Sequence, residues 1–374
     1  MRVLHIHSGN LYGGVETLLV ALARHRDLCP KMEPNFAVCF EGRLSEELAQ
    51  AEAPVHLLGN VRVSRPLTVW RSRRVLSDLL RRKRFDVVVC HSAWSQAIFG
   101  PVVRWARRPL VFWLHDATNG QHWLERWARR TTPDLALCNS RFTAGTLPKI
   151  YPRVRAELIY CPVTSPNGDY SRTDRALVRA ELNTPENATV IIQVGRMEAL
   201  KGHALHLEAL GLLRELPGWV CWQVGGAQRP HEVHYLENLK NTAAQLGIEE
   251  RVHFLGQRSD VPRLLAGADI YCQPNTVPEG FGMTFIEALL SPLPVVTTAI
   301  GGAKEILDSL CGILVRPDDA HALATSLRWL MENPTLRAQL GAAGPARART
   351  LCHPGTQMQR LYEALVSIPN NDLH

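Results

Sequence analysis

Two glutamates eight positions apart flank a glycine-containing turn in the second half of the chain. Glu279 precedes Gly280 and Gly282 in a stretch typical of a loop, and Glu287 lies in the run 283–290, whose apolar residues predict a helix. Glycine lets the backbone approach a ligand closely, and the first N–H groups of a helix can face an anion. We therefore expect an anion site here, with one carboxylate facing a sugar and the other a ribose. Taken alone, either glutamate reads equally well as a solvated surface residue.

A second anion motif lies upstream, directly after the apolar run 189–194. It reads Gly195-Arg196-Met197-Glu198-Ala199-Leu200-Lys201-Gly202 and leads into a predicted helix. Arginine offers a planar fork, lysine a point charge and the helix its positive end, which together suit a diphosphate. The motif is neither a Walker motif nor G-x-G-x-x-G.

The elements that must hold these residues alternate between strand and helix. Such alternation predicts parallel sheets covered by helices, with ligands at the carboxyl ends of the strands. Gly13-Gly14 and His115-Asp116 both fall at that edge. The predicted strands are 3–6, 36–40, 55–58, 86–91, 110–114, 135–138, 158–160, 189–194, 219–224, 252–255, 269–272 and 294–298, with a linker over 161–174. The main predicted helices are 15–24, 45–51, 67–84, 95–104, 203–213, 234–246, 262–266, 283–290, 320–332, 334–340 and 356–366.

Length and composition favour a globular chain with two domains. The chain has 374 residues, of which 46% are hydrophobic and 21% charged, and no apolar run approaches the length of about 20 residues that a membrane span needs. The first residues predict a strand, not a signal peptide. Nine cysteines without CxxC spacing favour reduced thiols in a cytoplasmic protein.

Positive charge is concentrated in the first half. Residues 1–163 hold 24 Lys and Arg against 13 Asp and Glu, a net charge of +11, whereas the remainder holds 18 against 22, a net charge of −4. The predicted helix 67–84 is rich in arginine, and a helical wheel places Arg74, Arg81 and Arg84 away from the apolar face of Val75, Leu76, Leu79 and Leu80. With the tryptophans near 105–127, this pattern predicts peripheral contact with an anionic membrane, against the plainer reading of a solvated helix.

The two motifs together resemble those of the retaining glycosyltransferases of family 4, which have the GT-B fold. Gly195-Arg196-Met197-x-x-x-Lys201-Gly202 and the E-x7-E pair Glu279 and Glu287 carry the resemblance, with a looser match at Gly13-Gly14-Val15-Glu16. The resemblance implies an α/β fold of two Rossmann-like parallel-sheet domains facing each other across a cleft. An N-terminal acceptor-binding domain would span 1–163, with a C-terminal helix of about 356–374 packing back on it. A donor-binding domain would span 164–355.

The resemblance also implies roles for single residues. Arg196 and Lys201 would hold the donor diphosphate and stabilise the departing nucleotide, Glu279 would bind hydroxyls of the transferred sugar, and His115 would lie near the reacting centre. These four are the expected catalytic residues. The expected donor-binding residues are Gly14, Arg196, Lys201, Gly282, Met283, Thr284 and Glu287. No metal and no cofactor beyond the nucleotide-sugar co-substrate is expected. The sequence departs from the family at Met197 and at Gly225-Gly226-Ala227, where no acid follows the glycines.

The function implied is that of a retaining hexosyltransferase in polysaccharide biosynthesis. It would move a sugar from a nucleoside-diphosphate sugar, with a UDP-sugar favoured, to a hydroxyl of a glycan or lipid-linked acceptor, in the cytoplasm or on the inner face of the membrane. Retention could use a covalent intermediate or attack from the leaving group's own face, and no nucleophile at the matched positions favours the first route. Three alternatives stay open, namely a non-hydrolysing nucleotide-sugar epimerase, a non-catalytic nucleotide-sugar binding protein and, without any recognised motif, a nucleic-acid binder.

Overall fold

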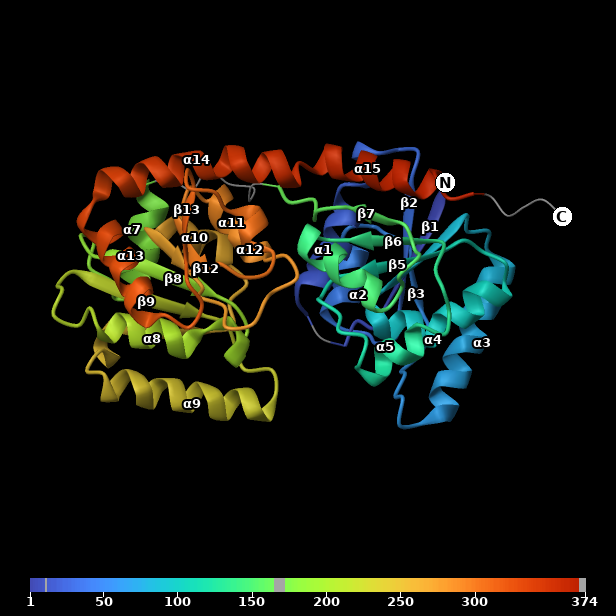
Figure 1. Cartoon of the computed structure of the whole chain (residues 1–374), viewed down its shortest axis with the longest axis horizontal. Coiled ribbons are helices and arrows are strands. Elements are labelled where there is room, and N and C mark those ends of the chain that lie inside the picture. Colours follow the sequence, from blue (N-terminus) through green and yellow to red (C-terminus); the bar gives the residue numbers. More distant parts are fainter. Residues whose placement is uncertain (11, 165–171, 370–374) are drawn as a thin grey trace. The chain divides into compact units, whose positions relative to one another are not determined.

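The computed structural model of the protein describes residues 1–10, 12–164 and 172–369 (Figure 1). Its internal contacts divide the chain into two compact units. The first comprises Met1–Val163 and the segment from Cys352 onward, and the second runs from Thr164 to Leu351. Leu11 of the first loop, 165–171 of the expected linker and 370–374 of the expected C-terminal segment lie outside the described residues.

The first unit is built on a seven-stranded parallel sheet in the order β3-β2-β1-β4-β5-β6-β7. Its central strands are almost wholly buried, and β4 and β5 are mostly apolar, as expected for a parallel sheet covered on both faces. The order reverses direction between β1 and β4, which is where such sheets bind ligands. The strands are β1 (Arg2–His7), β2 (Glu33–Val38), β3 (Val55–Leu57), β4 (Val87–His91), β5 (Leu110–Leu114), β6 (Leu135–Cys138) and β7 (Ala156–Leu158).

Helices of the first unit follow the predicted pattern, with two additions. The short helices α5 and α6 were not predicted, because six-residue helices give too little periodicity to recognise. The helices are α1 (Gly14–Arg24), α2 (Arg43–Gln50), α3 (Pro66–Arg82), α4 (Ser92–Trp105), α5 (Trp123–Ala128), α6 (Arg141–Thr146) and α15 (Pro354–Val366), with the 3-10 turns η1 (Arg26–Leu28) and η2 (Leu147–Lys149).

Two details of the predicted helix 67–84 are wrong. α3 ends at Arg82, so Arg84 is not on the helix, and Val75 is 43% exposed instead of lying on the buried face. The buried face is formed by Val69, Ser72, Leu76 and Leu80. The predicted apolar stripe was displaced because the polar Ser72, whose hydroxyl donates to the carbonyl of Gly59, takes a buried position.

The C-terminal helix α15 belongs to the first unit and lies along its edge strand β7 (Figure 1). The buried side chain of Gln357 accepts a hydrogen bond from the backbone N–H of Tyr160 at 3.1 Å, and the carbonyl of Cys352 accepts one from Val163 at 3.1 Å. Apolar residues at helical spacing, Met358, Leu361 and Leu365, are buried. This helix therefore completes the core at the β7 side of the sheet.

The second unit repeats the plan with a six-stranded parallel sheet in the order β10-β9-β8-β11-β12-β13. Its order reverses between β8 and β11. β13 was not predicted, and the other strands lie within about one residue of their predicted bounds. They are β8 (Thr189–Val194), β9 (Trp219–Val224), β10 (Val252–Gly256), β11 (Ile270–Cys272), β12 (Val295–Thr298) and β13 (Gly312–Val315).

Helices of the second unit differ from the prediction at several places. The helices Arg172–Glu181 and Ala303–Ile306 were not predicted, and the helix predicted at 234–246 begins at Pro230. The predicted helix 334–340 continues to Cys352, through Pro345. A Cβ at Gly341 or Gly344 would overlap the backbone of the segment 289–292, so these glycines allow close packing of the continued helix. The helices are α7 (Arg172–Glu181), α8 (His203–Gly211), α9 (Pro230–Gln245), α10 (Val261–Gly267), α11 (Met283–Leu290), α12 (Ala303–Ile306), α13 (Ala320–Glu332) and α14 (Pro334–Cys352), with η3 (Ala199–Lys201) and η4 (Glu249–Arg251).

Three other boundaries are corrected. β2 begins at Glu33, not at 36, because parallel pairing with β1 extends over Pro34, which is tolerated near the start of a strand. β7 covers 156–158, not 158–160, because only these residues pair with β6. The last residues of the expected linker, from Arg172, belong to α7.

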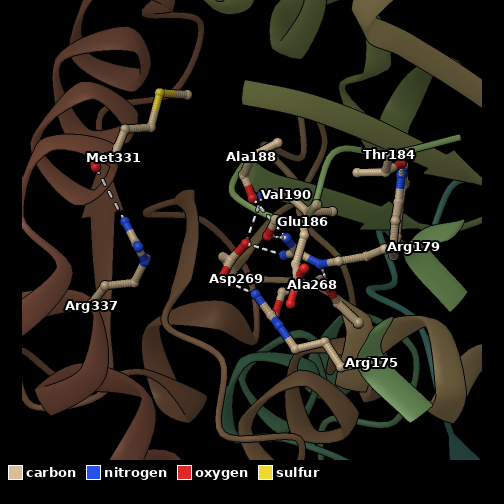
Figure 2. Close-up of polar contacts among 12 residues, drawn as sticks. Arg175, Arg179, Thr184, Glu186, Ala188, Val190, Ala268, Asp269, Met331 and Arg337 are labelled. Atoms are coloured by element: carbon tan, nitrogen blue, oxygen red, sulfur yellow. Dashed lines mark hydrogen bonds and ion pairs between the residues drawn. The ribbon is translucent and has the colours of Figure 1, made fainter. Parts of the chain in front are cut away.

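A buried charge cluster fastens α7 to the second sheet (Figure 2). Asp269, just before β11, binds Arg175 and Arg179 at 2.6 Å each and accepts the N–H of Val190 in β8 at 2.7 Å. Arg179 is only 2% exposed on its side chain, and its remaining N–H groups donate to the carbonyls of Gly267, Glu186 and Ala188. Because each of the three nitrogens of this buried guanidinium has an acceptor, the charge is tolerated, and it ties together the starts of β8 and β11.

Candidate active site

The predicted site residues of the second unit lie at the reversal between β8 and β11, a strand order that the sequence did not predict. β8 runs into Gly195 and Arg196, η3 carries Lys201, and β11 runs into Gln273. The loop that follows β11 carries Glu279 and leads into α11. All the predicted catalytic and donor-binding residues except Gly14 and His115 therefore lie in this one unit.

Both predicted cations are present, and each has a carboxylate partner. Lys201 Nζ lies 2.6 Å from Oε1 of Glu279, and a guanidinium nitrogen of Arg196 lies 3.0 Å from Oε1 of Glu198. The carbonyl of Lys201 accepts a hydrogen bond from the buried Gln193 side chain at 2.8 Å. The charge of each cation is thus already partly balanced by a glutamate. A bound anion would share the two cations with these glutamates.

Glu279 sits in a network of amides that the sequence did not single out. Its Oε2 accepts from Asn275 Nδ2 at 3.0 Å and from Gln273 Nε2 at 3.3 Å, while Oε1 faces Lys201. The hydroxyl of Tyr271 donates to Gln273 Oε1 at 3.0 Å. Three donors therefore fix this carboxylate. The only signal for them was that Gln273 and Asn275 are polar residues directly after a buried strand.

Tyr271 also links the two glutamates of the E-x7-E pair. Burial, followed by the negative charges of Glu279 and Glu287, raises the pKa of the Tyr271 hydroxyl well above its usual range. The phenol is therefore a permanent hydrogen-bond donor beneath the site, and both carboxylates lie close enough to influence it.

Close backbone contacts explain two of the glycines. A Cβ at Gly225, after β9, would overlap the carbonyl oxygen of Gly195, and a Cβ at Gly301, after β12, would overlap the backbone of Glu279. Gly301 also has φ of +58°, which disfavours other residues. The loops that carry Arg196 and Glu279 are thus braced by glycines of neighbouring strands.

α11 begins at the site. Its N-cap, Gly282, has φ of +108°, and the N–H groups of Met283 and Thr284 in its first turn have no acceptor within the helix. Glu287 lies one turn further and is half-buried. Burial alone raises the pKa of its carboxyl from 4.5 to about 7, and no hydrogen bond or ion pair joins it to another described residue. The carboxylate of Glu287 is therefore available to accept hydrogen bonds from hydroxyl groups of a ligand.

The raised pKa of Glu287 predicts a pH-dependent stability. The unfolded chain ionises this carboxyl near its ordinary value, whereas the folded chain does so near pH 7. Folding therefore favours the protonated form, and its contribution, complete below pH of about 4, is lost as the pH rises through 7. Thermal unfolding of the protein and of Glu287→Gln should be measured at pH 5.5 and at pH 8. The melting temperature of the variant, relative to that of the native chain, should be higher at pH 8 than at pH 5.5. An equal gap at both pH values would contradict the raised pKa.

The first unit presents a second polar edge at its own reversal between β1 and β4. After β1 the chain turns through Gly13, the N-cap of α1, into Gly14. Glu16 in the first turn of α1 accepts the N–H of Gly13 at 2.9 Å and binds Nε2 of His7, the last residue of β1, at 2.7 Å. The predicted Gly13-Gly14-Val15-Glu16 segment is thereby fixed to the end of β1.

His115, just after β5, is the end of a chain of three buried imidazoles. Its Nε2 lies 2.9 Å from Nδ1 of His91, and Nε2 of His91 lies 3.0 Å from Nδ1 of His5. The rings of His91 and His115 stack with centroids 5.1 Å apart, and Trp113 stacks on both. The sequence prediction included His115 but missed His91 and His5, although His91 ends a strand.

No group of three or more His, Cys, Asp or Glu side chains among the described residues is arranged to hold a metal ion. Within the same residues, no helix is long and apolar enough to cross a membrane. All nine cysteines are buried, and none of them forms a disulfide.

The chain matches two family profiles, one in each unit. Residues 12–165 match "Glycosyltransferase Family 4", and residues 174–347 match "Glycosyl transferases group 1". The chain is a member of the GT-B glycosyltransferases. The match of the first unit agrees with the family 4 assignment that the motifs predicted.

Relatives of this glycosyltransferase include a D-inositol 3-phosphate glycosyltransferase of Salinispora tropica. It is 31% identical over 237 residues, which cover 58% of this chain and 47% of that protein. The human alpha-1,3/1,6-mannosyltransferase ALG2 is 26% identical over 318 residues, covering 77% and 75%. The chain spans about half the length of the D-inositol 3-phosphate glycosyltransferases that it matches.

Solved structures share the fold over almost the whole chain. Anabaena Alr3699/HepE in complex with UDP has a TM-score of 0.84 and 26% identity, covering 98% of this chain and 100% of that one. WaaG, a glycosyltransferase involved in lipopolysaccharide biosynthesis, has a TM-score of 0.75 and 18% identity, covering 98% and 100%, and supports the fold alone.

Proposed function

We propose that this glycosyltransferase moves a sugar from a nucleoside-diphosphate sugar to an acceptor hydroxyl and retains the configuration of the anomeric carbon. The observation that carries the proposal is the cluster of Arg196, Lys201, Glu279 and the start of α11 at the β8/β11 reversal. It combines two cations, free helix N–H groups and an oriented carboxylate. A diphosphate needs the first two and a sugar hydroxyl the third.

The roles we assign follow the chemistry of each group. Arg196 and Lys201 bind the diphosphate with the N–H groups of Gly282, Met283 and Thr284. Glu287 accepts the ribose hydroxyls, and Glu279 accepts hydroxyls of the transferred sugar. In the first unit, the backbone of Gly14 faces the donor and His115 lies near the reacting sugar. That Anabaena HepE was solved with UDP and with UDP-glucose supports a uridine nucleotide as the donor carrier.

The transfer we propose takes place on one face of the sugar. The bond from the anomeric carbon to the leaving phosphate oxygen breaks, and the bond to the acceptor oxygen forms on the same side. The acceptor's proton passes to a phosphate oxygen, so that a nucleoside diphosphate leaves. Lys201, Arg196 and the start of α11 stabilise the charge that develops on it.

The direct test is a panel of nucleoside-diphosphate sugars, scored for released nucleoside diphosphate with and without a lipid and glycan extract from bacterial envelopes. We expect release that depends on the extract, and an α-linked product from an α-linked donor by NMR. Conversion of the donor to its C2 epimer without an acceptor would instead identify an epimerase. Tight binding without turnover of any donor would identify a binding protein.

We further propose that the first unit works at an anionic membrane, with a lipid-linked acceptor. The exposed stripe of α3 carries Leu67, Trp70, Arg71, Arg74 and Arg81 at helical spacing. Leu67 is 70% exposed and Trp70 57%, and Arg74 lies over the Trp70 ring at 5.7 Å. Helix α4 packs against α3, and α5 packs against α4, and these two helices add the exposed Trp105 and Trp123 (Figure 1). Exposed aromatic and basic side chains together suit a lipid headgroup region.

The structure changes which cations matter for this proposal. Arg81 is paired with Asp78, and Arg73 turns inward to donate to the carbonyl of Ile98 at 2.7 Å. Arg71 and Arg74 are left as the exposed cations of the helix centre, where no carboxylate among the described residues pairs with them. They replace Arg81 and Arg84 as the residues to test.

Charge reversal on α3 should strongly weaken vesicle binding. Each basic residue near an anionic surface is worth about 1 kcal/mol, so Arg71→Glu with Arg74→Glu should weaken flotation with phosphatidylglycerol-containing vesicles by about 30-fold or more. Lys240→Glu with Arg349→Glu, exposed in the second unit, gives the same charge change as a control. Equal flotation of the two double variants, or none by the native protein at low salt, would end the membrane proposal.

A further inference from the structure

The three histidines of the first unit form one hydrogen-bonded chain with a closed end. His5, in the middle of β1, and His91, at the end of β4, are buried and joined at 3.0 Å, and His91 is joined to His115 at 2.9 Å. Nε2 of His5 is buried and has no partner among the described residues. Nδ1 of His115 is likewise bound to no other described residue, but it is not among the buried unpartnered atoms. His115 is therefore the open end.

All three rings are neutral at physiological pH. Burial lowers the pKa of His5 and of His115 to about 3, and burial with its histidine neighbours lowers that of His91 well below the usual value. A neutral imidazole carries one proton and one lone pair. Each hydrogen bond between two rings needs one N–H and one lone pair, so the tautomer of one ring determines the tautomers of the other two.

Only two arrangements satisfy both links. In the first, each ring is protonated on Nδ1, so His5 donates to His91, and His91 donates to His115. In the second, each ring is protonated on Nε2, and every bond runs the other way. The second leaves the N–H of His5 Nε2 buried without an acceptor, whereas the first leaves only a bare lone pair there. Orphaned buried N–H groups are the rarer of the two in proteins, which favours the first.

We propose that His5 and His91 are positioning residues that hold His115 in its Nδ1-protonated tautomer, so that His115 offers a hydrogen-bond donor to an oxygen of the bound nucleotide sugar. The substrate part of this inference rests on the proposed function, and the tautomer part does not. The arrangement gives the open end of the chain a fixed polarity. His115 then acts as a donor and not as a base, which agrees with a transfer in which phosphate takes the acceptor's proton.

The surroundings keep the chain rigid. His5 stacks on Phe36 with centroids 5.5 Å apart and an angle of 22°, and Trp113 stacks on His91 and His115. The carbonyl of His115 accepts Asn139 Nδ2 at 2.8 Å, which holds the loop after β5. Ring rotation would break these stacks together with the hydrogen bonds, so the chain has a single geometry in which the two tautomer sets compete.

Histidine ¹⁵N spectra of the full chain test the tautomer without any substrate. Two-bond ¹H–¹⁵N correlations separate a protonated from an unprotonated ring nitrogen, and His115→Gln assigns the signals of His115. We expect Nδ1 of His115 to be protonated and Nε2 not. A protonated Nε2 on His115 would overturn the proposal.

Variants of His91 then test the positioning. His91→Phe keeps the stacking but removes both hydrogen bonds, and His91→Asn keeps an N–H near the position of Nδ1. We expect a mixture of His115 tautomers and a fall in kcat/KM of about tenfold in the Phe variant, with the native tautomer retained in the Asn variant. His56→Phe, on edge strand β3 and outside the chain of imidazoles, is the matched control. An unchanged His115 tautomer in His91→Phe would show that His91 does not set it. Native tautomers in a chain without transferase activity would overturn the proposed function alone.

Discussion

Glu279→Gln is expected to lower kcat for sugar transfer by about 10²–10³-fold, with little change in thermal stability. The carboxylate is held by Lys201 at 2.6 Å, Asn275 at 3.0 Å and Gln273 at 3.3 Å, so its oxygens have a fixed direction. The transition state of glycosyl transfer carries positive charge on the sugar ring. A fixed negative charge that accepts the sugar's hydroxyls stabilises that state more than the neutral substrate.

Glutamine keeps the shape of this side chain but not its charge. One oxygen becomes an NH₂ group, which cannot accept from Lys201 or from the amides. Binding of the nucleoside diphosphate alone should not weaken, because Glu279 competes with phosphate for Lys201. The expected result is therefore a fall in kcat without a matching rise in the Kd of UDP.

Steady-state kinetics and calorimetry on the same preparation separate these effects. Glu208→Gln, at an exposed residue of α8 with no side-chain partner among the described residues, is the control for the substitution itself. A Glu279→Gln enzyme within threefold of native kcat would remove Glu279 from the reaction, and a lower melting temperature would assign it a structural role.

The contrast between what was predicted and what was missed at this site has a physical cause. The sequence predicts Arg196, Lys201, Glu279 and Glu287 because each belongs to a short motif at a strand–helix junction. Gln273 and Asn275 carry no motif. They meet Glu279 because β11 lies beside β8 in the sheet, and strand order is a property of the whole unit.

The same holds in the first unit. His5, His91 and His115 lie up to 110 positions apart in the sequence, and only the neighbouring positions of β1, β4 and β5 bring them together. In parallel strands alternate residues share a face, so the odd-numbered His5, His91 and Trp113 align once the register is known. The spacing of these residues along the chain does not predict that register.

Fold class was predictable because parallel strands are continuous apolar runs, which stand out in β4, β5 and β8. Boundaries failed where glycine or proline has a packing role. Gly341, Gly344 and Pro345 suggest a helix end, yet α14 passes through all three because the glycines admit the backbone near Leu289. Glycine is found both where a helix ends and where two helices pack closely, so its presence alone does not tell the two cases apart.

Lys201→Ala is expected to raise the Kd of UDP by about 10–100-fold and that of uridine by less than about threefold. A hydrogen bond to a charged group is worth about 1.5–3 kcal/mol. Lys201 is only 15% exposed on its side chain, so solvent screens its charge weakly. Uridine has no phosphate, so it loses none of this interaction. Lys240→Ala, an exposed lysine of α9, should change neither constant.

The ion pair with Glu279 adds a second, opposing effect that a double variant can isolate. Without Lys201, the carboxylate of Glu279 keeps its negative charge beside the diphosphate and repels it. Glu279→Gln in the Lys201→Ala background should therefore recover part of the lost UDP affinity, although the single Glu279→Gln change hardly affects it. Calorimetry of the four proteins with UDP gives this coupling directly. Strictly additive changes would mean that Glu279 does not face the diphosphate. Equal losses for UDP and uridine in Lys201→Ala would mean that Lys201 supports the loop instead of binding phosphate.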